Sequence, residues 1–265
     1  MSSLNIAIAG ATGRIGKRLV VLANATPDMS VEDALVRKKH PDLGRDAGEI
    51  AGIGAIGVKL SDEISLDPQP NVLIDFTNPE ASRHWLHVCV SHRIPMVIGT
   101  TGLTKSDHHK INEAALVIPI LQAANTSMGV AVLNLMAGKM AKLLDDFDIE
   151  IVETHHRFKK DSPSGTAMAL ADRILEATGK TRSDLHIGRS ETSEARETGK
   201  IAIHSLRVGD VTGTHSVHFG GDGERLEITH SATSRDVFAQ GALRAAAWLA
   251  GRGAGRYRIE DVLGV

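Results

Sequence analysis

The sequence predicts an α/β protein with two parts: a Rossmann-like parallel sheet domain, and a second α+β domain with an open mixed sheet. Between Leu4 and Gln122, short apolar runs alternate with helical patterns and glycine turns, as in a series of β–α units. From residue 201 onward, runs of alternating polarity follow one another through short turns that contain Gly and Asp. Such runs are typical of antiparallel strands, so the fold class changes along the chain.

Composition narrows the class of protein. With 42% apolar and 23% charged residues and a net charge of −2, the chain is ordinary for a globular protein and unsuited to general nucleic-acid binding. Cys89 is the only cysteine, which excludes an internal disulfide and a zinc–thiolate cluster. The 13 histidines show no metal-ligand spacing, so we expect no metal. Neither a signal segment nor a membrane span is expected, and a cytoplasmic location is predicted.

The first unit combines a strand, a glycine turn and a helix. Leu4–Ala9 is predicted to be a buried strand, and it leads directly into glycines at positions 10, 13 and 16. This context suits a dinucleotide: Gly10 permits the tight turn, Gly13 lets the pyrophosphate approach, and Gly16 lets the helix pack closely. The spacing is GxxGxxG instead of GxGxxG, so a plain strand–helix turn is the alternative. The predicted cofactor-binding residues of this turn are Gly10, Ala11, Thr12, Gly13, Arg14 and Ile15.

The second predicted strand, Val31–Val36, bears on the choice of cofactor. A protein that prefers NAD often has Asp or Glu about 20 residues after the glycines, where it binds the ribose 2′-hydroxyl. Here that position holds Val36, and Arg37, Lys38 and Lys39 follow. Cations in place of an acid favour a 2′-phosphate, so NADPH is the expected cofactor, with NADH second and Arg37 as a cofactor-binding residue. A solvated basic turn is the alternative.

Three further strands are predicted at residues 71–77, 95–98 and 117–121, with helices at Pro79–His92 and Lys105–Ala115. Successive β–α units imply a parallel sheet, and the loops after its strands line the ligand crevice. The predicted cofactor-binding residues in these loops are Gly99, Thr100, Thr101, Ala123, Ala124, Asn125 and Thr126. Taken singly, each is readily explained as an ordinary turn residue.

A strand with one apolar face begins at Asp148. Polar and apolar residues alternate from this position, as in a half-buried strand. The face of Ile149 continues through Glu153, His155 and Arg157 if the strand runs on. The end of this strand therefore presents ionisable side chains on a face that is otherwise apolar.

A cationic loop and a helix follow that strand. Two histidines, one arginine and two lysines lie within His155–Lys160. Ser162 is expected to cap a helix with Pro163 at its first position, and the helix runs to Thr178 before Gly179. A strand end, a cationic loop and a helix N-terminus together predict a site for a small ligand that carries carboxylates. A solvated basic loop before a capped helix is the alternative.

The remaining segments complete two domains. We expect a helix over Met128–Leu144, an exposed loop over Ser183–Lys200, and antiparallel hairpins among strands at residues 201–208, 213–219 and 225–231. A helix over Arg235–Arg252 and a short strand over Tyr257–Ile259 return to the first domain. The predicted domains are thus residues 1–126 with 235–265 for the dinucleotide, and residues 127–234 for the substrate and for oligomerisation.

Two long motifs carry a resemblance to a known family. Glu153–Lys159 and Asp161–Ala167 match a signature of the form E-x-H-H-x-x-K-x-D-x-P-S-G-T-A, and Gly10–Gly16 and Gly99–Gly102 fit the cofactor half of the same family. The chain resembles the 4-hydroxy-tetrahydrodipicolinate reductases, formerly called dihydrodipicolinate reductases, of the diaminopimelate–lysine pathway. Val36 and Thr126 depart from the family, which often has Glu at the first position and in some members an aromatic residue at the second.

The resemblance implies NAD(P)H-dependent reduction of 4-hydroxy-tetrahydrodipicolinate to tetrahydrodipicolinate by a homotetramer. It implies that His155 is the proton donor and Lys159 the second catalytic residue, and that His156, Gly165 and Thr166 bind the dicarboxylate substrate. Two alternatives stay open at this point. One is another two-domain NAD(P)-dependent dehydrogenase, and the other is a non-catalytic NAD(P)H sensor.

Overall fold

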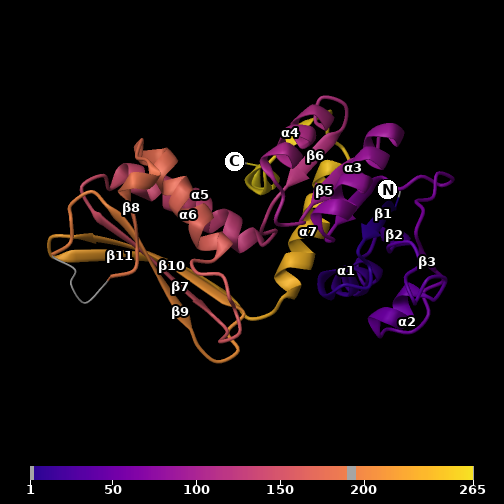
Figure 1. Cartoon of the computed structure of the whole chain (residues 1–265), viewed down its shortest axis with the longest axis horizontal. Helices are drawn as coiled ribbons and strands as arrows, with labels where there is room; N and C mark the ends of the chain where they lie inside the picture. Colours follow the sequence, from indigo (N-terminus) through magenta and orange to yellow (C-terminus); the bar gives the residue numbers. More distant parts are fainter. Residues whose placement is uncertain (1–2, 190–194, 265) are drawn as a thin grey trace. The chain divides into compact units, whose positions relative to one another are not determined.

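A computed structural model of the chain describes residues 3–189 and 195–264 (Figure 1). The chain divides into two compact units, one formed by Met1–Met128 with Asp236–Val265 and the other by Gly129–Arg235. Among the described residues, no helix is long and apolar enough to cross a membrane. One unit contains a parallel sheet with helices and the other a mixed sheet with helices, so the predicted fold class is confirmed.

The first unit is built on a seven-stranded parallel sheet in the order β12-β6-β5-β4-β1-β2-β3. Its central strands are buried and almost entirely apolar, as expected when helices cover both faces of a parallel sheet. The strands are β1 (Leu4–Ala9), β2 (Met29–Leu35), β3 (Leu60–Ser61), β4 (Val72–Asp75), β5 (Met96–Ile98), β6 (Pro119–Gln122) and β12 (Gly255–Tyr257). The terminal strand begins two residues earlier than predicted, because Ile259 is buried in a following 3₁₀ helix instead of extending the sheet.

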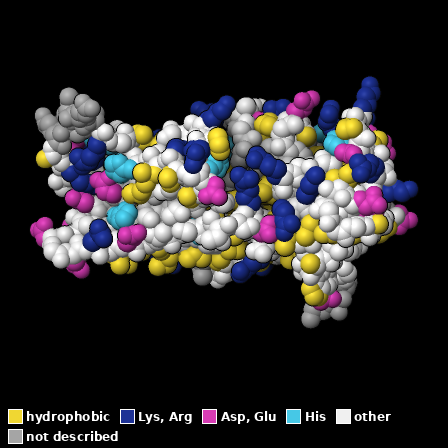
Figure 2. Space-filling model, turned by 90° about the horizontal axis from the view of Figure 1, so that it is seen from below, with side chains coloured by type: hydrophobic (Ala, Val, Ile, Leu, Met, Phe, Trp, Pro, Cys, Tyr) yellow, Lys and Arg dark blue, Asp and Glu magenta, His cyan; other side chains and the backbone are white. Residues whose placement is uncertain are grey.

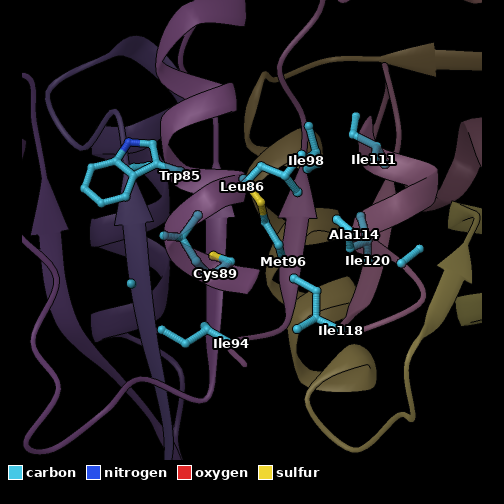
Figure 3. Packing of buried hydrophobic residues seen from close by; sticks show 14 of the residues in the cluster. Trp85, Leu86, Cys89, Ile94, Met96, Ile98, Ile111, Ala114, Ile118 and Ile120 are labelled. Atoms are coloured by element: carbon cyan, nitrogen blue, oxygen red, sulfur yellow. The ribbon is translucent and has the colours of Figure 1, made fainter. Parts of the chain in front are cut away.

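The helices of the first unit have clear local start signals. Asn78 caps α3, with Pro79 in its first turn, and Thr104 and Asp107 form a reciprocal capping box at the start of α4. Figure 3 shows side chains of α3 and α4, among them Leu86 and Ile111, in one buried hydrophobic cluster with Met96 and Ile98 of β5. The helices are α1 (Arg14–Asn24), α2 (Ala47–Ala51), α3 (Pro79–His92), α4 (Lys105–Ala114), α7 (Asp236–Leu249) and the 3₁₀ helix η2 (Ile259–Leu263).

Helix α7 joins the first unit through two close contacts. Arg18 of α1 makes a bidentate ion pair with Asp236, at 2.6 and 2.8 Å. Gly241 lies so close to the backbone that a Cβ at this position would be 1.7 Å from the Thr126 carbonyl oxygen. The C-terminal segment is therefore an integral part of the sheet unit that begins at the N-terminus.

The second unit contains a five-stranded mixed sheet in the order β11-β10-β7-β9-β8. Helices α5 and α6 cover one face of this sheet, as Figure 1 shows, and Ile151 and Phe219 are fully buried in the core beneath them. The elements are α5 (Met128–Leu143), β7 (Asp148–His155), α6 (Gly165–Thr178), η1 (Arg182–Asp184), β8 (Leu185–Ile187), β9 (Ile201–Arg207), β10 (Gly213–Gly221) and β11 (Glu224–Ala232).

The strand pairing confirms one predicted hairpin and corrects another. β10 and β11 are antiparallel neighbours, as expected. The expected hairpin between β9 and β10 is wrong, because β7 lies between them, parallel to β9 and antiparallel to β10. The connection from β9 crosses the end of β7, where Val208 N donates to His155 O and Arg157 N donates to Gly209 O. β7 thus takes the central position in the sheet, and the turn that contains Gly209 passes over its end.

Two further local predictions need correction. The helix starts at Gly165, with Ser164 as its cap accepting from Ala167 N, so the expected cap at Ser162 and helical Pro163 are wrong. Its predicted end is confirmed, because Gly179 has φ 67°. The expected loop Ser183–Lys200 contains the strand β8, which pairs with β9, a nonlocal contact that short polar segments do not signal. Residues 190–194 of that loop lie outside the described residues.

Candidate active site

The ionisable side chains of the second unit gather at the end of β7. Alternation along this strand places Ile149, Ile151, Glu153 and His155 on its buried face. The Glu153 side chain is 0% exposed, and His155 is 8% exposed. The strand ends at His155, so Arg157 is exposed beyond it and does not continue the face as predicted. The buried face of β7 therefore ends in the Glu153 carboxylate and the His155 imidazole, side by side.

The Glu153 carboxylate accepts several hydrogen bonds. Arg207, the last residue of β9, donates to both oxygens at 2.9 and 2.8 Å, and Ser164 N donates at 3.1 Å. His155 Nδ1 lies 2.5 Å from the Glu153 Oε2 atom. Burial alone would favour the neutral acid, but the hydrogen bonds from Arg207 and His155 outweigh it and lower the pKa of Glu153 to about 2. Glu153 is therefore an ion at neutral pH.

The imidazole of His155 lies among groups that compete over its charge. Burial lowers the pKa of His155 most strongly, Glu153 raises it, and the positive charges of Lys159 and Arg207 lower it further; the net shift is downward. His215 stands edge-on to His155 with ring centroids 5.1 Å apart. Burial and then the charge of His155 lower the pKa of His215 to about 4, so His215 is neutral near pH 7.

His215 and Ser164 connect the sheet to the start of α6. His215 lies opposite Glu153 in the β7–β10 register, and its Nε2 atom is 3.1 Å from Ser164 Oγ. Ser164 in turn caps the helix whose first two residues are Gly165 and Thr166. The structure therefore brings His155 close to the predicted substrate-binding residues Gly165 and Thr166. Space is open at Gly165, where an added Cβ would meet nothing within 4 Å.

The loop between β7 and α6 holds the other predicted residues. Lys159 Nζ forms an ion pair with Asp161 at 2.8 Å, and this contact lowers the pKa of Asp161. Arg207 also donates to Asp161 O at 2.6 Å, which fixes the loop over the end of β9. His156 Nδ1 is buried, and within residues 3–189 and 195–264 it has no hydrogen-bond partner. A polar ligand atom would satisfy that nitrogen.

The glycine turn of the first unit borders a cavity of about 680 Å³. Gly10 has φ +82°, and a Cβ there would lie 2.6 Å from Phe76 O, so no other residue fits without strain. A Cβ on Gly16 would lie 2.0 Å from Gly10 O. A bare backbone at the start of α1 is the surface that a pyrophosphate needs, and the residues present fit a dinucleotide.

The rim of this cavity carries the cations expected from the sequence. Val36 is buried directly after β2, while Arg37 and Lys38 are exposed and line the cavity together with His40. His40 Nε2 is 3.2 Å from Thr12 Oγ1 in the glycine turn. Acidic groups are also present in the lining, from Asp62 and Glu80. Position 36 itself offers no carboxylate to a ribose.

A buried carboxylate that is not among the predicted site residues joins two of the predicted cofactor loops. Asp75, at the end of β4, is 0% exposed and accepts from Thr77 Oγ1 at 2.5 Å and from Thr100 Oγ1 at 3.0 Å. Thr77 N also donates to Thr100 Oγ1 at 3.0 Å. Burial raises the pKa of Asp75, against these hydrogen bonds. Asp75 therefore holds the loops after β4 and β5 side by side.

The third predicted cofactor loop follows β6. Within it, Asn125 Oδ1 accepts from Ser127 N at 2.9 Å, and Thr126 Oγ1 donates to Phe238 O of α7 at 2.6 Å. Thr126 is 1% exposed. The Thr126 hydroxyl thus anchors this loop to α7.

Comparison with known proteins identifies the family. Residues 4–126 match the family model described as dihydrodipicolinate reductase, N-terminus, and residues 129–263 match dihydrodipicolinate reductase, C-terminus. The chain belongs to the dihydrodipicolinate reductase family. The 4-hydroxy-tetrahydrodipicolinate reductase of Anaeromyxobacter dehalogenans (strain 2CP-C) is 43% identical over 98% of this chain and 97% of its own. That of Geotalea uraniireducens (strain Rf4) is 43% identical over 99% of both chains.

Solved structures agree on the fold. The dipicolinate-bound dihydrodipicolinate reductase from Paenisporosarcina sp. TG-14 superimposes with a TM-score of 0.77 at 24% identity, covering 98% of this chain and 99% of that one. An amine dehydrogenase from Mycobacterium smegmatis gives a TM-score of 0.59 at 12% identity, covering 98% and 96%. With the family established, the predicted membership and the predicted class of enzyme, an oxidoreductase, are confirmed. The roles of individual residues in this dihydrodipicolinate reductase family member stay predictions.

Proposed function

We propose that this chain catalyses the NAD(P)H-dependent reduction of 4-hydroxy-tetrahydrodipicolinate to tetrahydrodipicolinate in the diaminopimelate/lysine pathway. The observation that carries the proposal is the Glu153–His155 pair beside Lys159 and the N-terminus of α6, in a chain whose curated relatives bear that enzyme's name. We assign the dinucleotide to residues 1–126 with 235–265, and the substrate and subunit contacts to residues 127–234. The test is loss of NADPH absorbance with freshly prepared substrate; no loss would contradict the proposal.

The residues of the second unit suit a small dianion and a proton transfer. Gly165 and Thr166 lie at the positive end of the α6 dipole, where one carboxylate is stabilised. His156 offers its buried Nδ1 atom to another oxygen of the substrate. When bound, NAD(P)H supplies the hydride. His155 gives a proton to the atom made basic by hydride addition, and Lys159 stabilises negative charge nearby.

The cofactor cavity supports a preference for NADPH over NADH. Gly10–Ile15, Gly99–Thr101 and Ala123–Thr126 would hold the common parts of either cofactor. Arg37 and Lys38 lie directly after the buried Val36, and both line the cavity. A guanidinium suits a phosphate group, which NADPH carries on its ribose and NADH does not.

Replacing Arg37 by Ala should therefore raise KM for NADPH and leave KM for NADH nearly unchanged. A hydrogen bond to a charged group is worth about 1.5–3 kcal/mol, so the expected rise is roughly 10- to 100-fold. Steady-state kinetics with each cofactor measure it, and Lys110→Ala, an exposed cation of α4 outside this cavity, is the control. Equal rises for both cofactors, or a strong NADH bias of the unaltered enzyme, would contradict the preference.

The second sheet supports assembly into a homotetramer. Helices cover one of its faces, and on the opposite face, which carries Thr154 of β7, its neighbour Leu206 of β9 is 50% accessible. Figure 2 shows hydrophobic side chains on the surface of the molecule among uncharged atoms. Burial of such a face against another copy would remove this apolar area from water. Light scattering gives the mass in solution, and a monomer would contradict the assembly.

A cytoplasmic location, where cells hold NAD(P)H, is part of the proposed function.

A further inference from the structure

The strongest unassigned feature is the set of groups around the His155 ring. Glu153 is fully buried, and both of its oxygens accept from the Arg207 guanidinium. With a pKa of about 2, the carboxylate has no proton to donate. The short contact of 2.5 Å to His155 Nδ1 therefore requires that this nitrogen carry the proton.

The other ring nitrogen lies beside a residue without a side chain. A Cβ on Gly213 would be 3.0 Å from His155 Nε2, tighter than an ordinary contact. Gly213 is the first residue of β10 and has an ordinary φ angle, so a backbone conformation does not require glycine here. What glycine provides is space at Nε2, the one ring nitrogen that Glu153 does not occupy.

Charged and titratable groups on each of the neighbouring elements favour or oppose a positive charge on the His155 ring. Glu153 on β7 is negative, Arg207 on β9 and Lys159 in the following loop are positive, and His215 on β10 is nearly neutral. An imidazolium beside Glu153 alone would be strongly stabilised and would hold its proton. Arg207, paired to both carboxylate oxygens, offsets that stabilisation.

We propose that Glu153 and Arg207 are paired positioning residues for His155. The carboxylate keeps a proton on Nδ1, so that Nε2 is the atom that gives a proton to the substrate. The guanidinium weakens the hold of the carboxylate on the imidazolium, so that the Nε2 proton can be transferred. This inference rests on the proposed function of His155. In the step, the Nε2–H bond of the imidazolium breaks, and a bond forms from that proton to the substrate atom that received electrons with the hydride. Neutral His155 remains, and its Nδ1–H still donates a hydrogen bond to Glu153.

The two residues predict opposite changes. In Glu153→Gln the imidazolium loses its anionic partner, so the alkaline limb of the kcat–pH profile should move to lower pH by about one unit, the low end of the effect of a neighbouring charge. In Arg207→Met the carboxylate is no longer offset, so the limb should move to higher pH. Arg207→Lys keeps the charge and should keep the limb close to its original position. A merely structural role of either residue would lower rates without moving the limb in opposite directions.

The same titration is followed without turnover by ¹⁵N and ¹³C NMR of the histidine-labelled full-length enzyme. The His155 resonances should show the Nδ1–H form when neutral, and their titration should shift downward in Glu153→Gln and upward in Arg207→Met. Thermal unfolding of each variant shows that it is folded. An unchanged His155 titration in both variants, shifts in the same direction, or an Nε2–H form would overturn the inference.

The chain offers a matched control on the same strands. Glu150 on β7 is 2.6 Å from His204 Nε2 on β9 and accepts from Arg196 at 2.9 Å, on the other face of the sheet. Glu150→Gln removes a carboxylate charge from the same strand and should leave the His155 titration unchanged. If NMR shows the opposite shifts but no variant or parent reduces the proposed substrate, the proposed function fails and the pairing stands. If the parent turns over and the His155 titration does not respond, the pairing fails alone.

Discussion

The His155→Gln variant is expected to lose at least about 100-fold in kcat, with a much smaller change in KM. A positioned general acid contributes typically 10²–10⁴-fold, and glutamine keeps a hydrogen-bonding side chain of similar reach but has no proton to transfer at neutral pH. The loss in kcat of Lys159→Ala is expected to lie in the same range, because this change removes a positive charge near the His155 ring that stabilises negative charge on the substrate. Steady-state rates with saturating NADPH and substrate give both values.

His109→Gln is the control for this prediction. His109 is exposed on α4 of the first unit and forms an ion pair with Glu113 at 3.4 Å, so its replacement should leave kcat unchanged. Whether the loss of activity in His155→Gln appears in kcat or in KM is also informative. A large rise in KM with normal kcat would place His155 in binding instead of proton transfer. Near-normal turnover by both His155→Gln and Lys159→Ala would remove the catalytic assignment altogether.

Replacing Gly16 by Ala should destabilise the enzyme by about 3 kcal/mol, the upper end of the usual cost of overpacking. The added Cβ would lie 2.0 Å from Gly10 O and 2.8 Å from Ala11 Cα, and both are backbone atoms that no side-chain rotation can move. The melting temperature should fall by roughly 6–12 °C for a unit of this size. Differential scanning calorimetry measures the change, and weaker cofactor binding should accompany it because the glycine turn must shift.

Gly251→Ala is the comparison for this variant. Gly251 follows α7, has no positive φ, and an added Cβ there would meet nothing within 4 Å. Its melting temperature should be close to that of the parent enzyme. If the Gly16→Ala enzyme unfolds at the same temperature as the parent, α1 can move away from the glycine turn at little cost. The close packing of this helix would then not contribute to stability.

The parts of the fold that were predictable are those with local signals. Leu4–Ala9 is apolar except for Asn5, Asn78 and Pro79 mark the start of α3, and Gly179 marks the end of α6. The position of β7 between β9 and β10 was not predictable in this way. Alternation indicates which residues share a face of a strand, but it carries no information about which strand is the neighbour.

The candidate site shows the same division. His155 and Lys159 stand out because they belong to a long motif of unusual residue types. The contact of Arg207 with Glu153 was not predictable, since Arg207 lies more than 50 residues after Glu153 in the chain and meets it through the parallel pairing of β7 with β9. Asp75 was visible as an acidic residue at a strand end, yet its burial depends on Thr100 of the next β–α unit. Partners made by sheet pairing are thus the ones that sequence patterns leave out.

The chain order of the first unit has a consequence for its biosynthesis. Helix α7 and strand β12 lie in Asp236–Val265, and the whole of Gly129–Arg235 is translated before them. The enclosed segment has all of its own strands available first, whereas the nascent N-terminal sheet must wait with the α7 surface uncovered. Loss of Asp236–Val265 would therefore harm the fold of residues that are translated before Gly129.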